Sequence, residues 1–240
     1  MKVKGIPEEI KDFLNREGGS SIFLKGSAGT GKTTLALELM EDMAEPDKSF
    51  YLSTRVSDEN LYKQFPWLKE KEMRSRIIDS SKVFLETLYE EESEEKDLPE
   101  EEKEKIKSAQ NFLKSIEEKE TPEEVDRTRL NELEKDIPSL KRVYDSIETI
   151  LPERPLLVID SVEGLTHKFG IEPEKFITTL QKDLVENSNT NLIMVLEQAE
   201  APELEYLVDG VVKLDRYLMD ERNVREIRLI KLRGIEIKQP

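Results

Sequence analysis

The sequence of 240 residues contains no cysteine and a single histidine, His167. The lack of cysteine excludes disulfide bonds, thiol catalysis and cysteine-ligated metals, and one histidine argues against a catalytic triad or a zinc site. The chain has no apolar run long enough to span a bilayer, and its first residues form no apolar signal segment, so we expect a cytoplasmic protein without a membrane partner. Any catalysis is therefore expected to use carboxylates, lysine, arginine and a metal ion.

Basic residues are outnumbered, with 37 Lys and Arg against 53 Asp and Glu, and the net charge is −16. The acidity is concentrated, because residues 86–126 hold 17 acidic and 6 basic side chains. A surface this acidic disfavours non-specific binding to DNA or RNA, since contacts with phosphates require basic side chains. We therefore expect no nucleic-acid partner.

One stretch, residues 26–33, fits the phosphate-binding pattern G-x-x-x-x-G-K-[ST] at every fixed position. A short apolar segment with strand character precedes it, and a segment of helical composition follows it. In such a loop the backbone N–H groups surround a phosphate, Lys32 reaches the β- and γ-phosphates, and the Thr33 hydroxyl holds Mg²⁺. The alternative interpretation is a chance glycine turn before a helix. The predicted binding residues are Gly26, Ser27, Ala28, Gly29, Thr30, Gly31, Lys32, Thr33 and Thr34.

A second segment, residues 156–160, is a run of four apolar residues that ends in Asp160. This pattern is typical of a buried parallel strand, whose carboxyl end faces the ligand in α/β folds. We expect Asp160 to orient the Mg²⁺ ion, with Ser161 hydrogen-bonded nearby. The alternative is an aspartate that merely begins a turn, which is common at the end of a strand.

The remaining pattern predicts an α/β fold in which a mostly parallel sheet is flanked by helices and followed by a C-terminal antiparallel hairpin. Residues 1–81 and 138–240 are expected to form the core, and 82–137 an inserted acidic helical segment. A solvated linker is the alternative for this insertion, because its apolar face is thin. Further elements are predicted at 7–15, 49–54, 58–65, 76–79, 172–185, 191–196, 210–214 and 224–232.

Three blocks, residues 157–166, 206–214 and 228–234, resemble the RecA-superfamily ATPases, and in particular their KaiC-like archaeal branch. Residues 51–56 also resemble the P-loop domain of the gas-vesicle regulatory protein D family. The resemblance implies a RecA-like core, ATP with Mg²⁺ as ligand, and a homo-oligomer in which each nucleotide lies at a subunit boundary.

The same resemblance assigns a role to two basic residues near the end of the chain. It implies that Lys231 and Arg233 reach the γ-phosphate of the neighbouring subunit. Because they lie two residues apart on a predicted strand, they share a face, and a simple solvated strand face is the alternative.

The sequence departs from that superfamily where a catalytic glutamate is expected, just after the second strand. Arg55-Val56 stands there, and neither residue can act as a base. Glu59 lies one helical turn further on, and Glu163 and Glu197 are other candidates. Gln198, or Glu197 beside it, is predicted to sense the γ-phosphate, although a polar residue also commonly begins a loop. We therefore expect firm ATP binding with slow hydrolysis or none.

These observations favour an ATP-binding regulatory or assembly factor with weak Mg²⁺-dependent ATP hydrolysis. The alternative is a non-hydrolysing, nucleotide-gated adaptor that binds a protein partner through residues 82–137. A DNA-recombinase paralogue is less well supported, since no aromatic and basic strand-binding loop is evident. The predicted metal ligands are Thr33 and Asp160. The candidate catalytic residues are Lys32, Asp160, Glu59, Gln198, Lys231 and Arg233.

Overall fold

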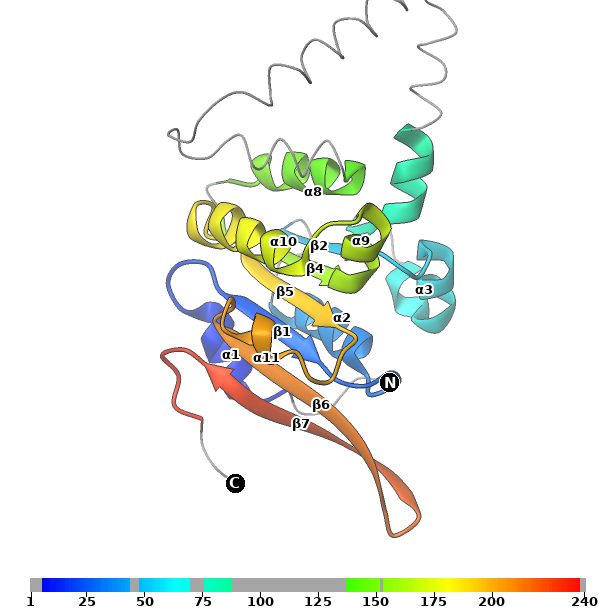
Figure 1. Cartoon of the computed structure of the whole chain (residues 1–240), viewed down its shortest axis with the longest axis vertical. Helices are drawn as coiled ribbons and strands as arrows, with labels where there is room; N and C mark the ends of the chain where they lie inside the picture. The colour runs from blue at the N-terminus through cyan, green and yellow to red at the C-terminus, as the bar shows by residue number, and fades with distance from the viewer. Residues whose placement is uncertain (1–5, 44–47, 70–75, 88–136, 152, 238–240) are drawn as a thin grey trace, which may run out of the picture.

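The strands of the computed structural model form one twisted sheet in the order β3-β2-β4-β5-β1-β6-β7 (Figure 1). The structure describes residues 6–43, 48–69, 76–87, 137–151 and 153–237. Neighbouring strands are parallel except for β7, which runs antiparallel to β6. The strands are β1 (Ser21–Lys25), β2 (Ser49–Ser53), β3 (Ile77–Asp79), β4 (Leu156–Asp160), β5 (Asn191–Leu196), β6 (Gly210–Met219) and β7 (Arg222–Leu232).

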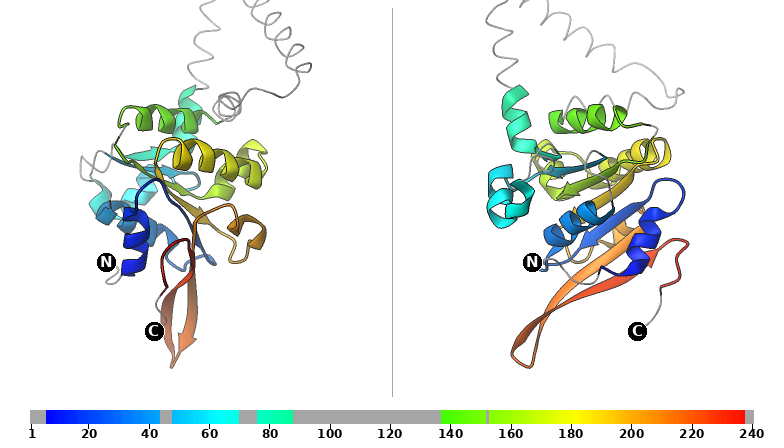
Figure 2. Two further views of the ribbon diagram at one scale, coloured as in Figure 1. Left: turned by 90° about the vertical axis from the view of Figure 1, so that its left-hand side faces the viewer. Right: turned by 180° about the vertical axis from the view of Figure 1, so that it is seen from behind.

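Helices cover both faces of the sheet, as Figures 1 and 2 show. Apolar side chains of one group of helices pack on one face, and those of a second group pack on the other. The first group is α1 (Glu8–Asn15), α2 (Lys32–Met43), α3 (Asp58–Gln64) and the 3-10 helix η1 (Pro66–Lys69). The second group is α8 (Pro138–Glu148), α9 (Val162–Phe169), α10 (Pro173–Leu180), the π-helix η2 (Gln181–Glu186) and the short α11 (Pro202–Glu205).

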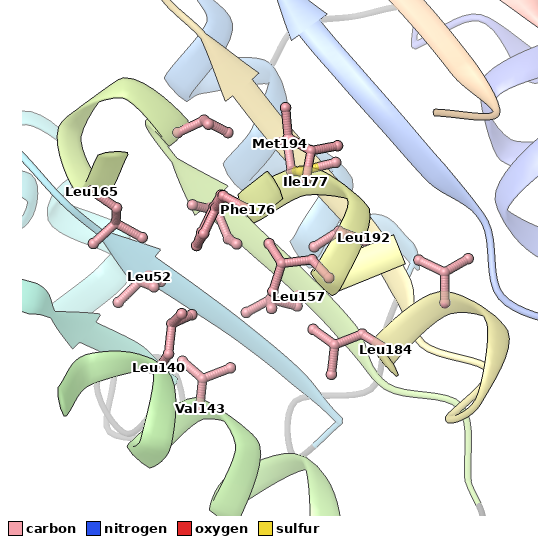
Figure 3. Packing of buried hydrophobic residues seen from close by; sticks show 14 of the residues in the cluster. Leu52, Leu140, Val143, Leu157, Leu165, Phe176, Ile177, Leu184, Leu192 and Met194 are labelled. Atoms are coloured by element: carbon pink, nitrogen blue, oxygen red, sulfur yellow. The ribbon is translucent and has the colours of Figure 1, made fainter. Parts of the chain in front are cut away.

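The central strands contribute side chains to two hydrophobic cores, because successive side chains point to opposite faces of the sheet. On β4, Leu157 and Ile159 join the core beneath α10, whereas Leu156 and Val158 join the core beneath α2. Figure 3 shows Phe176 of α10 close to Leu157 in the first of these cores. Each fully buried side chain of this size stabilises the fold by roughly 1.5–3 kcal/mol. Burial on both faces explains why these strands are continuous apolar runs.

The predicted α/β architecture is confirmed, and most predicted strands agree with the observed ones within about a residue. The hairpin differs mainly in β6, which runs to Met219 instead of residue 214, whereas β7 begins at Arg222, two residues before the predicted 224, and ends at Leu232 as predicted. The two strands meet at Asp220 and Glu221. These two residues have positive φ values of 48° and 63°, as a tight hairpin turn requires. The prediction ended β6 at residue 214 because the outer part of the hairpin projects from the sheet (Figure 2). Tyr217, Leu218 and Met219 are exposed there next to polar side chains and form no alternating pattern.

The predicted insertion at 82–137 lies largely outside the described residues, so its organisation stays a prediction. Residues 80–87 are helical, and α8 begins at Pro138. Within the described ranges, no helix combines the length and the apolar character needed to cross a membrane.

Candidate functional site

The glycine-rich segment forms the connection between β1 and α2, at the carboxyl end of the parallel strands. Gly26, Gly29 and Gly31 have φ values of 149°, 77° and 104°, a region that residues with a side chain rarely adopt. A Cβ atom at Gly26 would also lie 2.2 Å from the backbone oxygen of Leu214 on β6. The backbone therefore requires glycine here, and the loop leads into a helix whose first N–H groups and dipole favour an anion.

Lys32 is the first residue of α2, and its side chain turns back over the loop. Its Nζ atom donates hydrogen bonds to the backbone oxygens of Gly26, at 2.6 Å, and Ser27, at 3.0 Å. Burial lowers the pKa of Lys32, while the negative charges of Asp160 and Glu197 oppose this effect. The ammonium group is thus held within the cradle where a phosphate is expected to bind.

Thr33 and Asp160 meet beside this lysine, although they come from α2 and from the end of β4. Thr33 Oγ1 donates a hydrogen bond of 2.6 Å to Asp160 Oδ2. The hydroxyl of Tyr51, on β2, donates to the same oxygen, also at 2.6 Å. Burial raises the pKa of Tyr51 well above its ordinary value, and the charge of Asp160 raises it further. Tyr51 therefore remains a donor that fixes the orientation of the carboxylate.

The Thr33 hydroxyl and the Asp160 carboxylate fit the requirements of a magnesium ion. Mg²⁺ prefers oxygen ligands and commonly takes one or two protein side chains together with phosphate oxygens and water. No group of three or more His, Cys, Asp or Glu side chains is placed to hold a metal in the described part of the chain. A site completed by a nucleotide is consistent with that result.

Arg55, which stands where a catalytic glutamate was expected, forms an ion pair with Glu197 at the end of β5. The Ser161 hydroxyl donates to the other carboxylate oxygen of Glu197 at 3.4 Å. Glu163 Oε1 accepts the backbone N–H groups of Glu197, at 2.8 Å, and Gln198, at 3.3 Å. The carboxylates whose charges act on the pKa of Lys32 are Asp160 at the end of β4, Glu197 just after β5 and Glu163 of α9.

Glu59 and Gln198 are both exposed. Glu59 lies in the first turn of α3, and the charges that shift the pKa of Lys32 belong to Asp160, Glu197 and Glu163, so Glu59 does not contribute. The structure thus brings Lys32, Thr33 and Asp160 together but does not add Glu59 to them.

Lys231 and Arg233 lie near the amino end of β6, away from their own phosphate loop. Lys231 Nζ donates to the backbone oxygens of Glu205, at 3.0 Å, and Val208, at 2.6 Å. Arg233 Nη1 contacts Asp209 Oδ1 at 3.2 Å. Both side chains contact the segment that precedes β6, and Arg233 lies just beyond the end of β7, so the shared strand face stays a prediction.

Sequence reasoning missed several residues of this site. Tyr51 was assigned only to a strand, and its one signal is a hydroxyl-bearing aromatic among apolar residues. Thr54 was also missed, and its hydroxyl accepts the Ser161 N–H at 2.7 Å. Arg216 and Arg225, from the hairpin, reach the loop as well, and exposed arginines on a polar strand give no sequence signal of such a position.

A glycine cradle, a lysine at the start of the following helix, and an aspartate at the end of a parallel strand define a P-loop nucleotide-binding domain. The family model described as "GvpD gas vesicle protein, P-loop domain" matches residues 10–233. The chain therefore belongs to the GvpD P-loop domain family, and the resemblance to the gas-vesicle regulatory protein D family is confirmed.

Two curated relatives come from Halobacterium salinarum. The chain is 26% identical to protein GvpD2 over 245 residues and 25% identical to protein GvpD1 over 243 residues. These alignments cover 97% and 96% of the chain but only 41% and 37% of the relatives. The chain thus spans about two fifths of the length of these proteins.

A solved structure supports the fold assignment. The crystal structure of a KaiC-like protein from Pyrococcus horikoshii is similar with a TM-score of 0.56 and 18% identity, covering 93% of this chain and 83% of the other. The fold is therefore that of the KaiC-like proteins, as the resemblance implied.

Proposed function

We propose that this chain binds ATP with Mg²⁺ and acts as a nucleotide-dependent regulatory or assembly factor with weak ATP hydrolysis. The observation that carries the proposal is the contact of Thr33 with Asp160 beside Lys32. Backbone N–H groups and the Lys32 ammonium bind the phosphates, while Thr33 and Asp160 hold the metal. Bound Mg²⁺ supplies charge neutralisation between the phosphate oxygens.

Slow hydrolysis is proposed because no carboxylate is free at the expected position. Glu197 is a candidate base because its charge acts on Lys32, but Arg55 and Ser161 both donate to it. Both oxygens of this carboxylate already accept hydrogen bonds, so neither is directed at an attacking water molecule. Arg55 and Glu197 are both exposed to a considerable extent, so a rearrangement that separates them costs little. The weak activity is assigned to that rearranged state.

Assembly into a homo-oligomer with the nucleotide at a subunit boundary is part of the proposal. Its support is the position of Lys231 and Arg233, which lie in the segment 228–234 that resembles the KaiC-like branch. Within their own subunit they contact the segment before β6 and not the phosphate loop. In an oligomer, Lys231 and Arg233 of one subunit can reach the nucleotide that is bound by the phosphate loop of the neighbouring subunit.

The second candidate is a non-hydrolysing adaptor that is gated by ATP and binds a protein partner through residues 82–137. The Arg55 and Glu197 pair favours it, because the residue expected to activate water is replaced by a cation. In this version the nucleotide sets the conformation or the oligomeric state, and the acidic segment binds the partner.

Binding and turnover measured on the same preparation test the proposal and separate its two versions. We expect Mg·ATP to bind, and phosphate release to be slow and absent in Lys32→Ala. Binding without Lys32-dependent turnover supports the adaptor, whereas brisk turnover that disappears in Lys32→Ala contradicts it. If the parent chain binds no nucleotide, both versions fail.

A further inference from the structure

The β6–β7 hairpin presents two arginines to the phosphate loop. Arg216 and Arg225 are directly opposite each other in the antiparallel pair, so their side chains share one face. Arg216 Nη1 lies 3.7 Å from the position of a Cβ atom on Gly29, and Arg225 Nη1 lies 3.5 Å from the same position on Gly31. The two guanidinium groups therefore border the loop on which the phosphates are proposed to bind.

These two arginines differ from other basic residues of the same hairpin. Lys213 forms an ion pair with Glu200, and Arg228 forms one with Asp215. Within the described residues, no hydrogen bond or ion pair involves Arg216 or Arg225. Lys213 and Arg228 are thus neutralised, whereas Arg216 and Arg225 beside the loop, like Arg222 at the tip, have no such partner among the described residues.

Two like charges directly opposite each other on a strand pair repel each other and destabilise the pair. The chain has more acidic than basic residues, yet no carboxylate of the described residues pairs with these two arginines. An anion bound between the guanidinium groups removes the repulsion. Phosphate suits this position because the planar fork of arginine matches two phosphate oxygens at once. The alternative is that Arg216 and Arg225 only face solvent, and that their approach to the loop serves no binding role.

We propose that Arg216 and Arg225 bind the polyphosphate of the nucleotide held by their own subunit's loop. The proposal rests on the proposed nucleotide binding and adds the preference of the site. Two additional cations favour a nucleoside triphosphate over a diphosphate and a diphosphate over a monophosphate, and they do not select the base. Lys231 and Arg233 are proposed to act across a subunit boundary, whereas this pair acts within the subunit.

Calorimetric titrations of the full chain with Mg²⁺ and ATP, ADP or AMP test the pair. We compare the parent with Arg216→Gln, Arg225→Gln and the double variant. Arg222→Gln is the matched control, since it removes the same charge at the tip of the same hairpin. We expect each single variant to lose about tenfold in ATP affinity and the double variant more, as charge-assisted hydrogen bonds predict. The loss should decrease from ATP to ADP to AMP, and Arg222→Gln should stay within about twofold.

Circular dichroism and thermal unfolding establish that each variant is folded. If the double glutamine variant is unstable, the combination of Arg216→Lys and Arg225→Lys replaces it, because lysine keeps the charge but cannot bind two phosphate oxygens at once. Retention of the parent's ATP affinity in the double variant overturns the inference, while Lys32-dependent binding by the parent leaves the nucleotide site standing. If the parent fails to bind ATP, the proposed function and the inference fail together. An equal loss in Arg222→Gln overturns the inference too, because it shows a general charge effect.

A mixing experiment tests whether the arginines act within the subunit. The Lys32→Ala chain keeps both arginines, and the double arginine variant keeps an intact loop. Action within the subunit predicts no gain of ATP affinity when the two are mixed. Recovery of affinity in the mixture contradicts the assignment to the same subunit.

Discussion

Thr33 Oγ1 lies 2.6 Å from Asp160 Oδ2, although the two residues are 127 positions apart in the chain. The contact exists because β1 and β4 are parallel and lie on either side of β5, so that the loop after β1 and the end of β4 reach the same edge of the sheet. It joins the proposed phosphate cradle to the proposed metal ligand.

Asp160→Asn should remove most of the contribution of Mg²⁺ to ATP binding. The amide keeps the shape of the side chain but loses the negative charge that a hard cation requires. We expect an ATP affinity in Mg²⁺ about tenfold below that of the parent and close to the value measured with EDTA. Calorimetry under both conditions checks this, with Thr33→Ser as a control that keeps a hydroxyl group. An unaltered response to Mg²⁺ would show that Asp160 is not a metal ligand.

Tyr51→Phe should destabilise the fold while preserving its packing. The ring is fully buried, and the substitution removes the hydroxyl group that donates to Asp160. Because the acceptor is charged, we expect the free energy of unfolding to fall by about 1–3 kcal/mol. Urea denaturation with an unchanged m-value is the measurement. No loss would indicate that the hydroxyl does not bond to Asp160 in solution.

The stability difference between the parent and Tyr51→Phe should depend on pH in the alkaline range. Burial and then the charge of Asp160 raise the pKa of Tyr51 in the folded state above the ordinary value of 10.0. The stabilisation that goes with the retained proton is complete below pH 10 and is lost as the pH rises towards the folded-state pKa. Parallel denaturation series should therefore converge above pH 10, and a constant difference would contradict the raised pKa.

ATP affinity should fall at high pH, beginning at a lower pH than for an ordinary lysine. Burial lowers the pKa of Lys32 from 10.5, and bound phosphate requires the charged form. Affinity is therefore greatest below the free-state pKa of Lys32 and declines as the pH rises through it. A pH series of calorimetric titrations, compared with Lys32→Arg, measures the effect, because arginine stays charged. If ATP affinity declines with pH in the same way in the parent and in Lys32→Arg, the titration of Lys32 is not the cause of the decline.

Gly164→Ala should destabilise the protein, although alanine normally favours a helix by about 1 kcal/mol over glycine. A Cβ atom there would lie 2.1 Å from Thr54 Oγ1, whose hydrogen bonds to Ser161 prevent it from moving away. We expect a loss of about 1–3 kcal/mol in thermal or chemical unfolding. The control is Gly170→Asn, at an open position with a φ of 65°, which should cost less than about 1 kcal/mol. A stabilised Gly164→Ala would refute the close packing.

The sequence predicted the parts of the fold and site that depend on local patterns. The glycine loop and Lys32 follow from a fixed spacing, and Asp160 follows from an apolar run that ends in a carboxylate. The contact of Tyr51 with Asp160 depends on which strands are neighbours in the sheet, and no local pattern reveals it. The helix α9 was missed because it begins directly after β4, with Ser161 as its N-cap. No loop residues separate the strand from the helix and mark the boundary in the sequence.

Long-range register explains the other omissions. The pairing of Arg55 with Glu197 requires β2 and β5 to end at the same edge, on either side of β4. The approach of Arg216 to Gly29 requires β6 to continue past residue 214, where the predicted strand ended. The catalytic roles predicted for Glu59, Gln198, Lys231 and Arg233 remain predictions.

The central claim is that the loop around Lys32 binds a nucleoside triphosphate. Isothermal titration of the parent chain and of Lys32→Ala with ATP in the presence of Mg²⁺ tests it most directly. The account predicts saturable binding by the parent and none by a folded Lys32→Ala chain. Equal ATP binding by the two chains would contradict it.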